Sequence, residues 1–162
     1  MNAPQQGRNT LPLKLMVILI VIIGLGAVLY LPKLLEETPP QSRSLLAAPG
    51  CDLSNSSCVA SADQSRISLT INSPEIRSAT PLKFEVQLQG LDADQVMLDL
   101  KGRDMYMGLN QVMMTPVADK PGLWQADATL AVCTTGTMVW VASIVTEKSA
   151  QITQADFQFS AQ

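Results

Sequence analysis

The sequence contains no histidine, only 4% aromatic residues and 15% charged residues. Without histidine there is no Ser-His-Asp or Cys-His catalytic set, no imidazole metal ligand and no side chain whose ordinary pKa lies near neutral pH. The net charge of −3 argues against a nucleic-acid-binding protein, whose footprint is basic, and the aromatics are too few for a surface on which bases stack. Carboxylate pairs, zinc-ligand spacings and phosphate-binding glycine loops are also missing, so we do not expect an enzyme.

The longest run without a charge extends from Leu15 to Leu31 and contains seventeen residues. With the apolar residues just before it, this run is long enough for a helix that crosses a hydrocarbon core of about 30 Å. A cleaved signal peptide is the alternative, but its apolar region is usually 7–15 residues long and is followed directly by small residues. We therefore predict an uncleaved transmembrane helix over residues 15–32.

The charges that flank this run predict its orientation. Residues 1–14 contain Arg8, Lys14 and the amino terminus without any acidic residue, whereas Lys33 and Arg43 lie among acidic residues. Because positively charged flanks stay in the cytoplasm, the N-terminal segment should be cytoplasmic. We expect a single-pass membrane protein whose C-terminal domain lies outside the cytoplasm.

Residues 33–65 are rich in proline, serine and asparagine and contain few large apolar residues, which predicts a flexible linker. Cys51 and Cys58 lie within this segment, seven residues apart. In an oxidising compartment such a pair most often closes a small disulfide loop. A thiol pair for metal or redox chemistry, or pairing between chains, is the alternative, although the spacing is not the C-x-x-C of oxidoreductases.

From residue 66 to 162 the sequence has the period of two that is typical of strands with one buried face. The strands are expected at 67–71, 82–88, 96–101, 111–117, 123–131, 137–146 and 152–160. Turn residues separate them and no convincing amphipathic helix is present. We predict an all-β fold, an immunoglobulin-like antiparallel β-sandwich of about seven strands; a small closed barrel is the alternative.

Six of the eight methionines lie between residues 97 and 138, together with Cys133. In an extended chain Met105 and Met107 would place two thioethers on one face, about 7 Å apart. Met113 lies in the following strand, and Cys133 lies beside a turn. Thioether and thiolate sulfurs are soft ligands that select Cu(I), and such a site needs no histidine. These four residues therefore form the predicted Cu(I) site.

The same methionines also fit a structural role, because methionine fills irregular gaps in protein cores. Met114 and Met138 share their strand faces with apolar residues and should be buried, whereas Met97 alternates with charged residues and should face outward. A lone Cys133 is often a buried, inert thiol.

The stretch 104–145 resembles small membrane-anchored periplasmic proteins of proteobacteria, the FixH-like and YtkA-like proteins. The points of match are D-M-x-M-G-x-N at 104–110, Gly122-x-Trp124, and Cys133 with Gly136 and Trp140. The resemblance implies an accessory factor in copper delivery or cytochrome oxidase biogenesis, whose partners are a terminal oxidase or its assembly factors. It also implies an anchor in the bacterial inner membrane, with the N-terminus in the cytoplasm and the C-terminal domain in the periplasm. The missing histidine departs from copper chaperones that pair histidine with methionine, which puts a Cu(II) role in doubt. The alternative is a metal-free interaction module that docks on a membrane protein complex through a strand edge.

Overall fold

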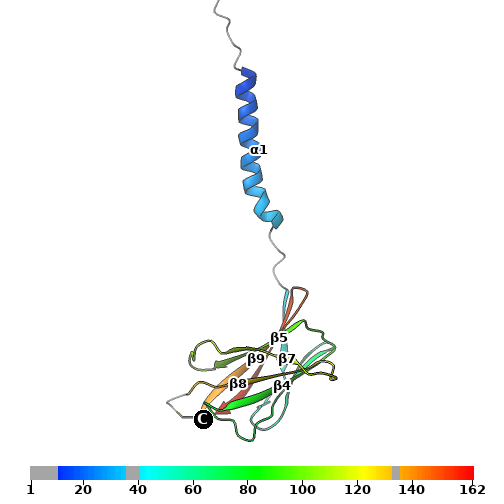
Figure 1. The fold of residues 1–162 in the computed structure, drawn as a ribbon, viewed down its shortest axis with the longest axis vertical. Coiled ribbons are helices and arrows are strands. Elements are labelled where there is room, and N and C mark those ends of the chain that lie inside the picture. The colour runs from blue at the N-terminus through cyan, green and yellow to red at the C-terminus, as the bar shows by residue number, and fades with distance from the viewer. Residues whose placement is uncertain (1–10, 36–40, 133–135) are drawn as a thin grey trace, which may run out of the picture. The chain divides into compact units, whose positions relative to one another are not determined.

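The computed structural model describes residues 11–35, 41–132 and 136–162. The chain forms two compact units, Met1–Pro39 and Pro40–Gln162. The first unit contains the helix α1 (Leu11–Leu35), which includes the uncharged run and has no acidic residue in its first turn (Figure 1). Within the described residues, no helix meets the length and apolarity needed to cross a membrane.

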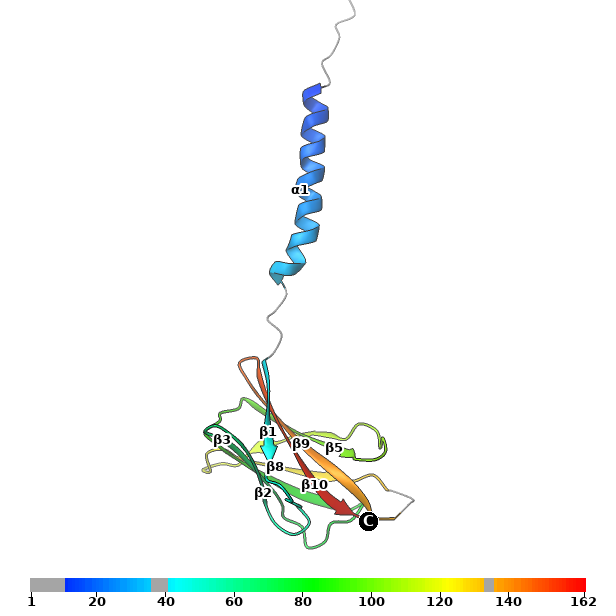
Figure 2. The same ribbon diagram turned by 180° about the vertical axis from the view of Figure 1, so that it is seen from behind.

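The second unit is built from strands, which confirms the prediction of an all-β fold for this part of the chain (Figures 1 and 2). Its strands are β1 (Gln41–Ala47), β2 (Cys58–Ala62), β3 (Ser65–Ile71), β4 (Pro81–Gln89), β5 (Gln95–Gly102), β6 (Gln111–Met113), β7 (Thr115–Pro116), β8 (Leu123–Thr129), β9 (Met138–Lys148) and β10 (Gln151–Ala161). Each of the seven runs of alternating residues coincides with one or two of these strands, since 111–117 divides into β6 and β7.

All ten strands belong to one hydrogen-bonded sheet in the order β6-β5-β9-β10-β1-β2-β3-β4-β8-β7. Strand β1 joins the two halves of this sheet. Its first part, Gln41–Leu45, pairs in parallel with β10, while Leu46 and Ala47 pair antiparallel with β2. The sheet is thus continuous and has ten strands, where about seven strands in a sandwich were predicted.

The sheet curves round on itself, because its two end strands are neighbours in sequence. Strands β6 and β7 lie at opposite ends of the order, yet Met114 alone connects them. Met114 is 4% exposed, as predicted for a core residue, and its backbone N–H donates to the carbonyl of Val96 at 2.8 Å. One buried residue therefore brings the two ends of the sheet together around the interior.

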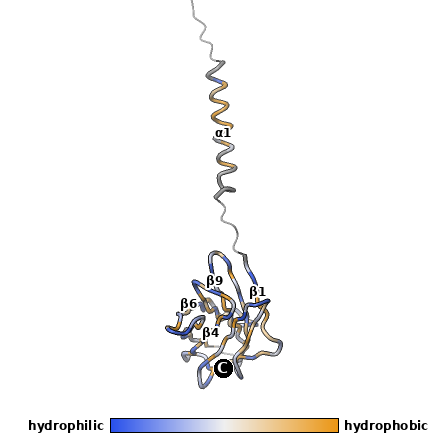
Figure 3. Tube along the Cα trace, turned by 90° about the vertical axis from the view of Figure 1, so that its right-hand side faces the viewer, coloured by the Kyte–Doolittle hydropathy of each residue, from blue (hydrophilic) through white to orange (hydrophobic). Residues whose placement is uncertain are grey.

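The inward residues of the strands form the core. Figure 3 shows apolar and polar residues interspersed along the strands, as the period of two predicts. The largest buried side chains include Trp140, Phe84, Phe157 and Phe159. Phe84 and Phe159 come from the two halves of the sheet and pack edge to face, with ring centroids 6.3 Å apart. This core supplies the main stabilisation of the unit through burial of apolar area.

The structure corrects the predicted linker at 33–65, because the folded unit begins at Pro40 and already includes β1 and β2. Cys51 and Cys58 are joined by a disulfide, with their Cα atoms 5.7 Å apart. The loop between them is held on β10, where the N–H of Leu53 donates to the carbonyl of Gln158 at 2.9 Å. Small polar residues resemble a tether in sequence, but these long-range hydrogen bonds order them in the fold.

Candidate functional site

The candidate site is built on the segment between β5 and β6, residues 103–110, which we call the methionine loop. Both of its ends are fixed by hydrogen bonds. At the start, the N–H of Arg103 donates to the carbonyl of Val139 at 2.9 Å, which continues the pairing of β5 with β9. At the end, Asn110 Nδ2 donates to the carbonyl of Thr129 at 2.9 Å. The loop is therefore attached to strands of both halves of the sheet.

Gly102, the last residue of β5, is the point at which two methionines meet. A β-carbon at this position would lie 2.7 Å from Met138 Cε and 3.1 Å from Met107 Cγ. The same point lies 2.5 Å from the carbonyl oxygen of Met105. The absence of a side chain at Gly102 therefore lets the side chains of Met107 and Met138 and the backbone of Met105 approach one another closely.

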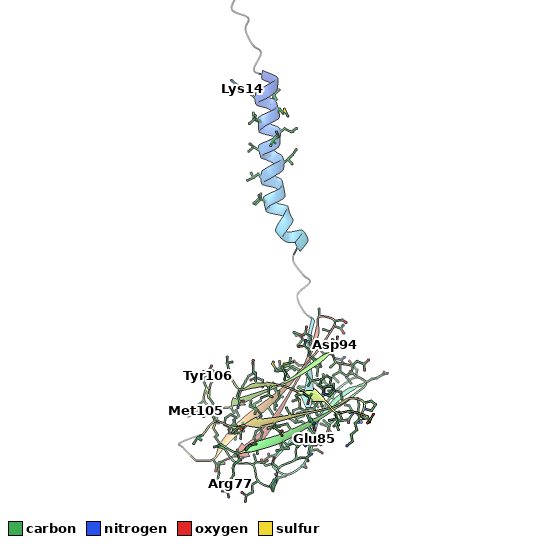
Figure 4. All side chains as sticks on the ribbon, in the orientation of Figure 1. Lys14, Arg77, Glu85, Asp94, Met105 and Tyr106 are labelled. Carbon is green, nitrogen blue, oxygen red and sulfur yellow. A yellow bond between two sulfur atoms is a disulfide. The ribbon has the colours of Figure 1, made fainter. Side chains whose placement is uncertain are left out.

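The three methionines differ in how far they are open to solvent. Met107 and Met138 are half-buried and pack against the hydrophobic core. Met105 is 47% exposed. The next residue, Tyr106, is also at the surface, and both lie on the outside of the unit (Figure 4). Met107 and Met138 thus form a sheltered pair of thioether side chains, and the exposed Met105 lies beside them.

A cleft of about 460 Å³ runs along the methionine loop and the end of β5. It is lined by Asp99, Lys101, Gly102, Arg103, Asp104, Met105, Tyr106, Met107, Gly108 and Leu109. Its charged side chains pair with one another, Lys101 with Asp99 at 2.8 Å and Arg103 with Asp104 at 3.0 Å. Hydrogen bonds from Arg103 hold the pKa of Asp104 below its ordinary value, so this carboxylate stays charged and paired. The uncharged side chains that line the cleft are the thioethers of Met105 and Met107, the phenol of Tyr106 and the isobutyl group of Leu109.

The structure brings together only part of the predicted Cu(I) set. Met105 and Met107 both lie at Gly102, although one is exposed and the other packs on the core. Met113 lies opposite Met97, and Gly102 lies five residue steps further along β5, about 16 Å of strand, so Met113 is separated from this site. Cys133 lies outside the described residues.

Met138 is the residue that sequence reasoning missed, because its strand pattern predicts a core position. It does pack against the core, but it also contacts the position of Gly102. The antiparallel register that pairs Gly102 with Trp140 brings the first residue of β9 to the end of β5. The sequence contains one local sign of this contact: Gly102 stands at the end of β5, and the apolar strand β9 that pairs with it begins with Met138. Within the described ranges, no group of three or more histidine, cysteine or acidic side chains is placed to hold a metal ion.

No protein-family model matches the sequence, and no curated protein is similar to it. Among solved structures, the chain is similar to a DUF4785 family protein from Legionella pneumophila, with 14% sequence identity and a TM-score of 0.39. The similarity covers 60% of this chain and 28% of that one.

Proposed function

We propose that this chain is a membrane-anchored periplasmic accessory factor that binds Cu(I) and serves the biogenesis of a cytochrome oxidase. It acts without catalysis of its own. The uncharged run within α1 and the positive charges before it support the anchor and its orientation. The passage of β1 between the two halves of an otherwise antiparallel sheet supports an immunoglobulin-like classification. The resemblance of the stretch 104–145 supports the link to oxidase assembly.

The observation that carries the metal-binding role is the meeting of Met107 and Met138 at Gly102. Thioether sulfurs are neutral, do not titrate and do not form disulfides, so they remain available in an oxidising compartment. They are soft ligands and favour Cu(I) over harder cations. A half-buried position limits the access of water and oxidants to the metal. Met105, whose carbonyl oxygen also lies at Gly102, is the candidate for a further sulfur, and Cys133 stays a predicted ligand.

A competition titration tests this proposal. The full chain, kept in detergent, is titrated with Cu(I) against a chromogenic chelator. We expect the wild type to compete at micromolar chelator, and Met107→Leu and Met138→Leu each to weaken binding by about tenfold or more, equivalent to 1.4 kcal/mol. Leucine preserves the volume and apolar character of methionine. Met97→Leu, which removes a half-buried thioether away from Gly102, is the matched control and should bind like the wild type. A wild type that does not compete would refute the metal-binding role.

A second candidate function is a metal-free module that docks on a membrane protein complex, such as a terminal oxidase. The observation that favours it is the exposure of Tyr106 and Leu109, which are 83% and 82% exposed. Apolar side chains that gather in one exposed patch mark contact surfaces, and these two residues lie in one loop and line the same cleft. The end strands β6 and β7 have only three and two residues, so the methionine loop offers a larger surface than a strand edge.

A co-purification experiment distinguishes the two proposed functions. If docking is the function, Tyr106→Ser with Leu109→Ser should abolish recovery of the membrane complex, while Met107→Leu and Met138→Leu should leave it intact. If Cu(I) binding is the function, the methionine variants should lower the copper content of the oxidase. Equal recovery and copper content with all variants would contradict both.

A further inference from the structure

We infer that Met105 is an exchange ligand, through which Cu(I) enters and leaves the site formed by Met107 and Met138. The inference rests on the proposed Cu(I) function and assigns a separate role within it. Its basis is the position of Met105, whose carbonyl oxygen lies at Gly102 with the sheltered pair while the residue as a whole is 47% exposed. The backbone of Met105 thus lies beside the site, while about half of the residue is open to solvent.

A methionine side chain suits this role because it is unbranched and turns about three bonds. From a backbone next to Gly102, rotation about these bonds turns the sulfur of Met105 toward the sheltered pair or toward solvent. Met107 and Met138 cannot do the same, because both pack against the core. Among the described methionines of the second unit, only Met113 has similar exposure, at 53%, and its place opposite Met97 keeps it away from Gly102.

The exchange involves neither electrons nor protons. Copper remains Cu(I), and one neutral thioether replaces another soft ligand in its coordination sphere. On uptake, the metal binds the exposed sulfur of Met105 and then gains Met107 and Met138 while the donor's ligand leaves. Release follows the same steps in reverse. A ligand used only in transit lowers the barrier in both directions and leaves the equilibrium affinity unchanged.

This role differs measurably from the two other roles that Met105 could have. A permanent third ligand would contribute to affinity, so its loss would speed release and raise Kd. A side chain without a role in binding would change neither rate nor affinity. An exchange ligand alone predicts slower uptake and slower release with an unchanged Kd.

Stopped-flow measurements with a bidentate chromogenic Cu(I) chelator test this prediction on the full chain in detergent. Met105→Leu should slow uptake and release by roughly tenfold, which corresponds to about 1.4 kcal/mol of activation free energy. Its Kd should stay within about threefold of the wild-type value. Met105→Gln, of similar length but without sulfur, should behave like Met105→Leu. Met113→Leu, with matched exposure, should exchange at the wild-type rate.

The outcomes separate the two proposals. If Met105→Leu raises Kd as strongly as Met107→Leu, Met105 is a permanent ligand and the exchange role is refuted. Unchanged rates in Met105→Leu and Met105→Gln also refute it, while loss of affinity in Met107→Leu and Met138→Leu still supports the Cu(I) function. If those two variants keep wild-type affinity, the proposed function fails, and the exchange role fails with it.

Discussion

At the scale of single residues, Gly102 determines whether the methionine side chains can meet. It ends β5 opposite Trp140, and a β-carbon there would come within 2.5 Å of the backbone oxygen of Met105. The end of a methionine side chain can turn away, but a backbone carbonyl can move only if the methionine loop shifts with it. The geometry of the site therefore depends on the missing side chain.

We expect Gly102→Ala to lower the free energy of unfolding by about 1–3 kcal/mol, as overpacking does. It should also weaken Cu(I) binding, because Met107 and Met138 are forced apart. Urea unfolding and the chelator titration measure the two effects. Gly50→Ala is the control, since Gly50 has a φ of +74° and no neighbour within 4 Å of an added β-carbon. It should lose stability through backbone strain and keep its affinity; a similar loss of affinity in both variants would contradict this account.

The ion pair between Lys148 and Asp94 makes a second prediction at this scale. Lys148 Nζ lies 2.5 Å from Asp94 Oδ1, and its hydrogen bond lowers the pKa of Asp94. A carboxyl group with a lowered folded-state pKa stabilises the fold above its unfolded pKa, near 3.8, and loses this contribution as pH falls through the folded pKa. Asp94→Asn should therefore flatten the fall of Tm below pH about 4. Both groups are exposed, so the difference should disappear in 1 M salt, where screening acts within about 3 Å. A difference that persists in high salt would contradict a surface ion pair.

At the scale of elements, the disulfide loop between β1 and β2 covers part of β10. Besides the bond from Leu53, the N–H of Ser160 donates to Ser54 Oγ at 3.0 Å. These bonds reach the part of β10 beyond its pairing with β1, which ends at Ala155. The loop thus protects backbone groups at a strand edge that would otherwise be open to other chains.

We expect the double variant Cys51→Ala, Cys58→Ala to have a free energy of unfolding about 2–3 kcal/mol lower than the wild type. The reason is that opening a short covalent loop raises the entropy of the unfolded chain. Urea unfolding in the presence and absence of reductant measures this. The reduced wild type should match the double variant, and reductant should not change the variant further. An unchanged midpoint on reduction of the wild type would show that the loop is held by its hydrogen bonds alone.

At the scale of the whole second unit, the closure of the sheet depends on Met114 between β6 and β7. Its side chain is buried, and its neighbours pair with β5 on one side and β8 on the other. Because strands at both ends of the sheet meet here, a defect at this residue affects both halves of the core.

Met114→Ala should lower the free energy of unfolding by about 2–5 kcal/mol, as methionine truncations in cores do. Met113→Ala is the control, since its side chain is exposed, and it should stay within about 0.5 kcal/mol of the wild type. Denaturant unfolding followed by tryptophan fluorescence measures both, because Trp140 is fully buried. Similar stabilities of the two variants would contradict the importance of this closure.

Local pattern explains which parts of the fold could be predicted. The runs that became β3, β4 and β10 alternate clearly enough to show their buried faces, whereas β1 and β2 carry small and polar residues and depend on pairing with β10 and β3. For the site, the pattern located Met105 and Met107 but placed Met138 in the core. Its contact with Gly102 follows from the register of β5 and β9, which no local pattern contains.

The sequence by itself determined the all-β class of the second unit, the apolar helix before it, and the exclusion of histidine-based chemistry. These properties follow from composition and from the period of the side chains, which decide locally which face of a strand is buried. Only the tertiary structure decided that the sheet closes through Met114 and that Met107 meets Met138 at Gly102. The physical reason is that strand pairing joins residues far apart in the chain, so the contacts at Gly102 exist only once β5 and β9 are aligned.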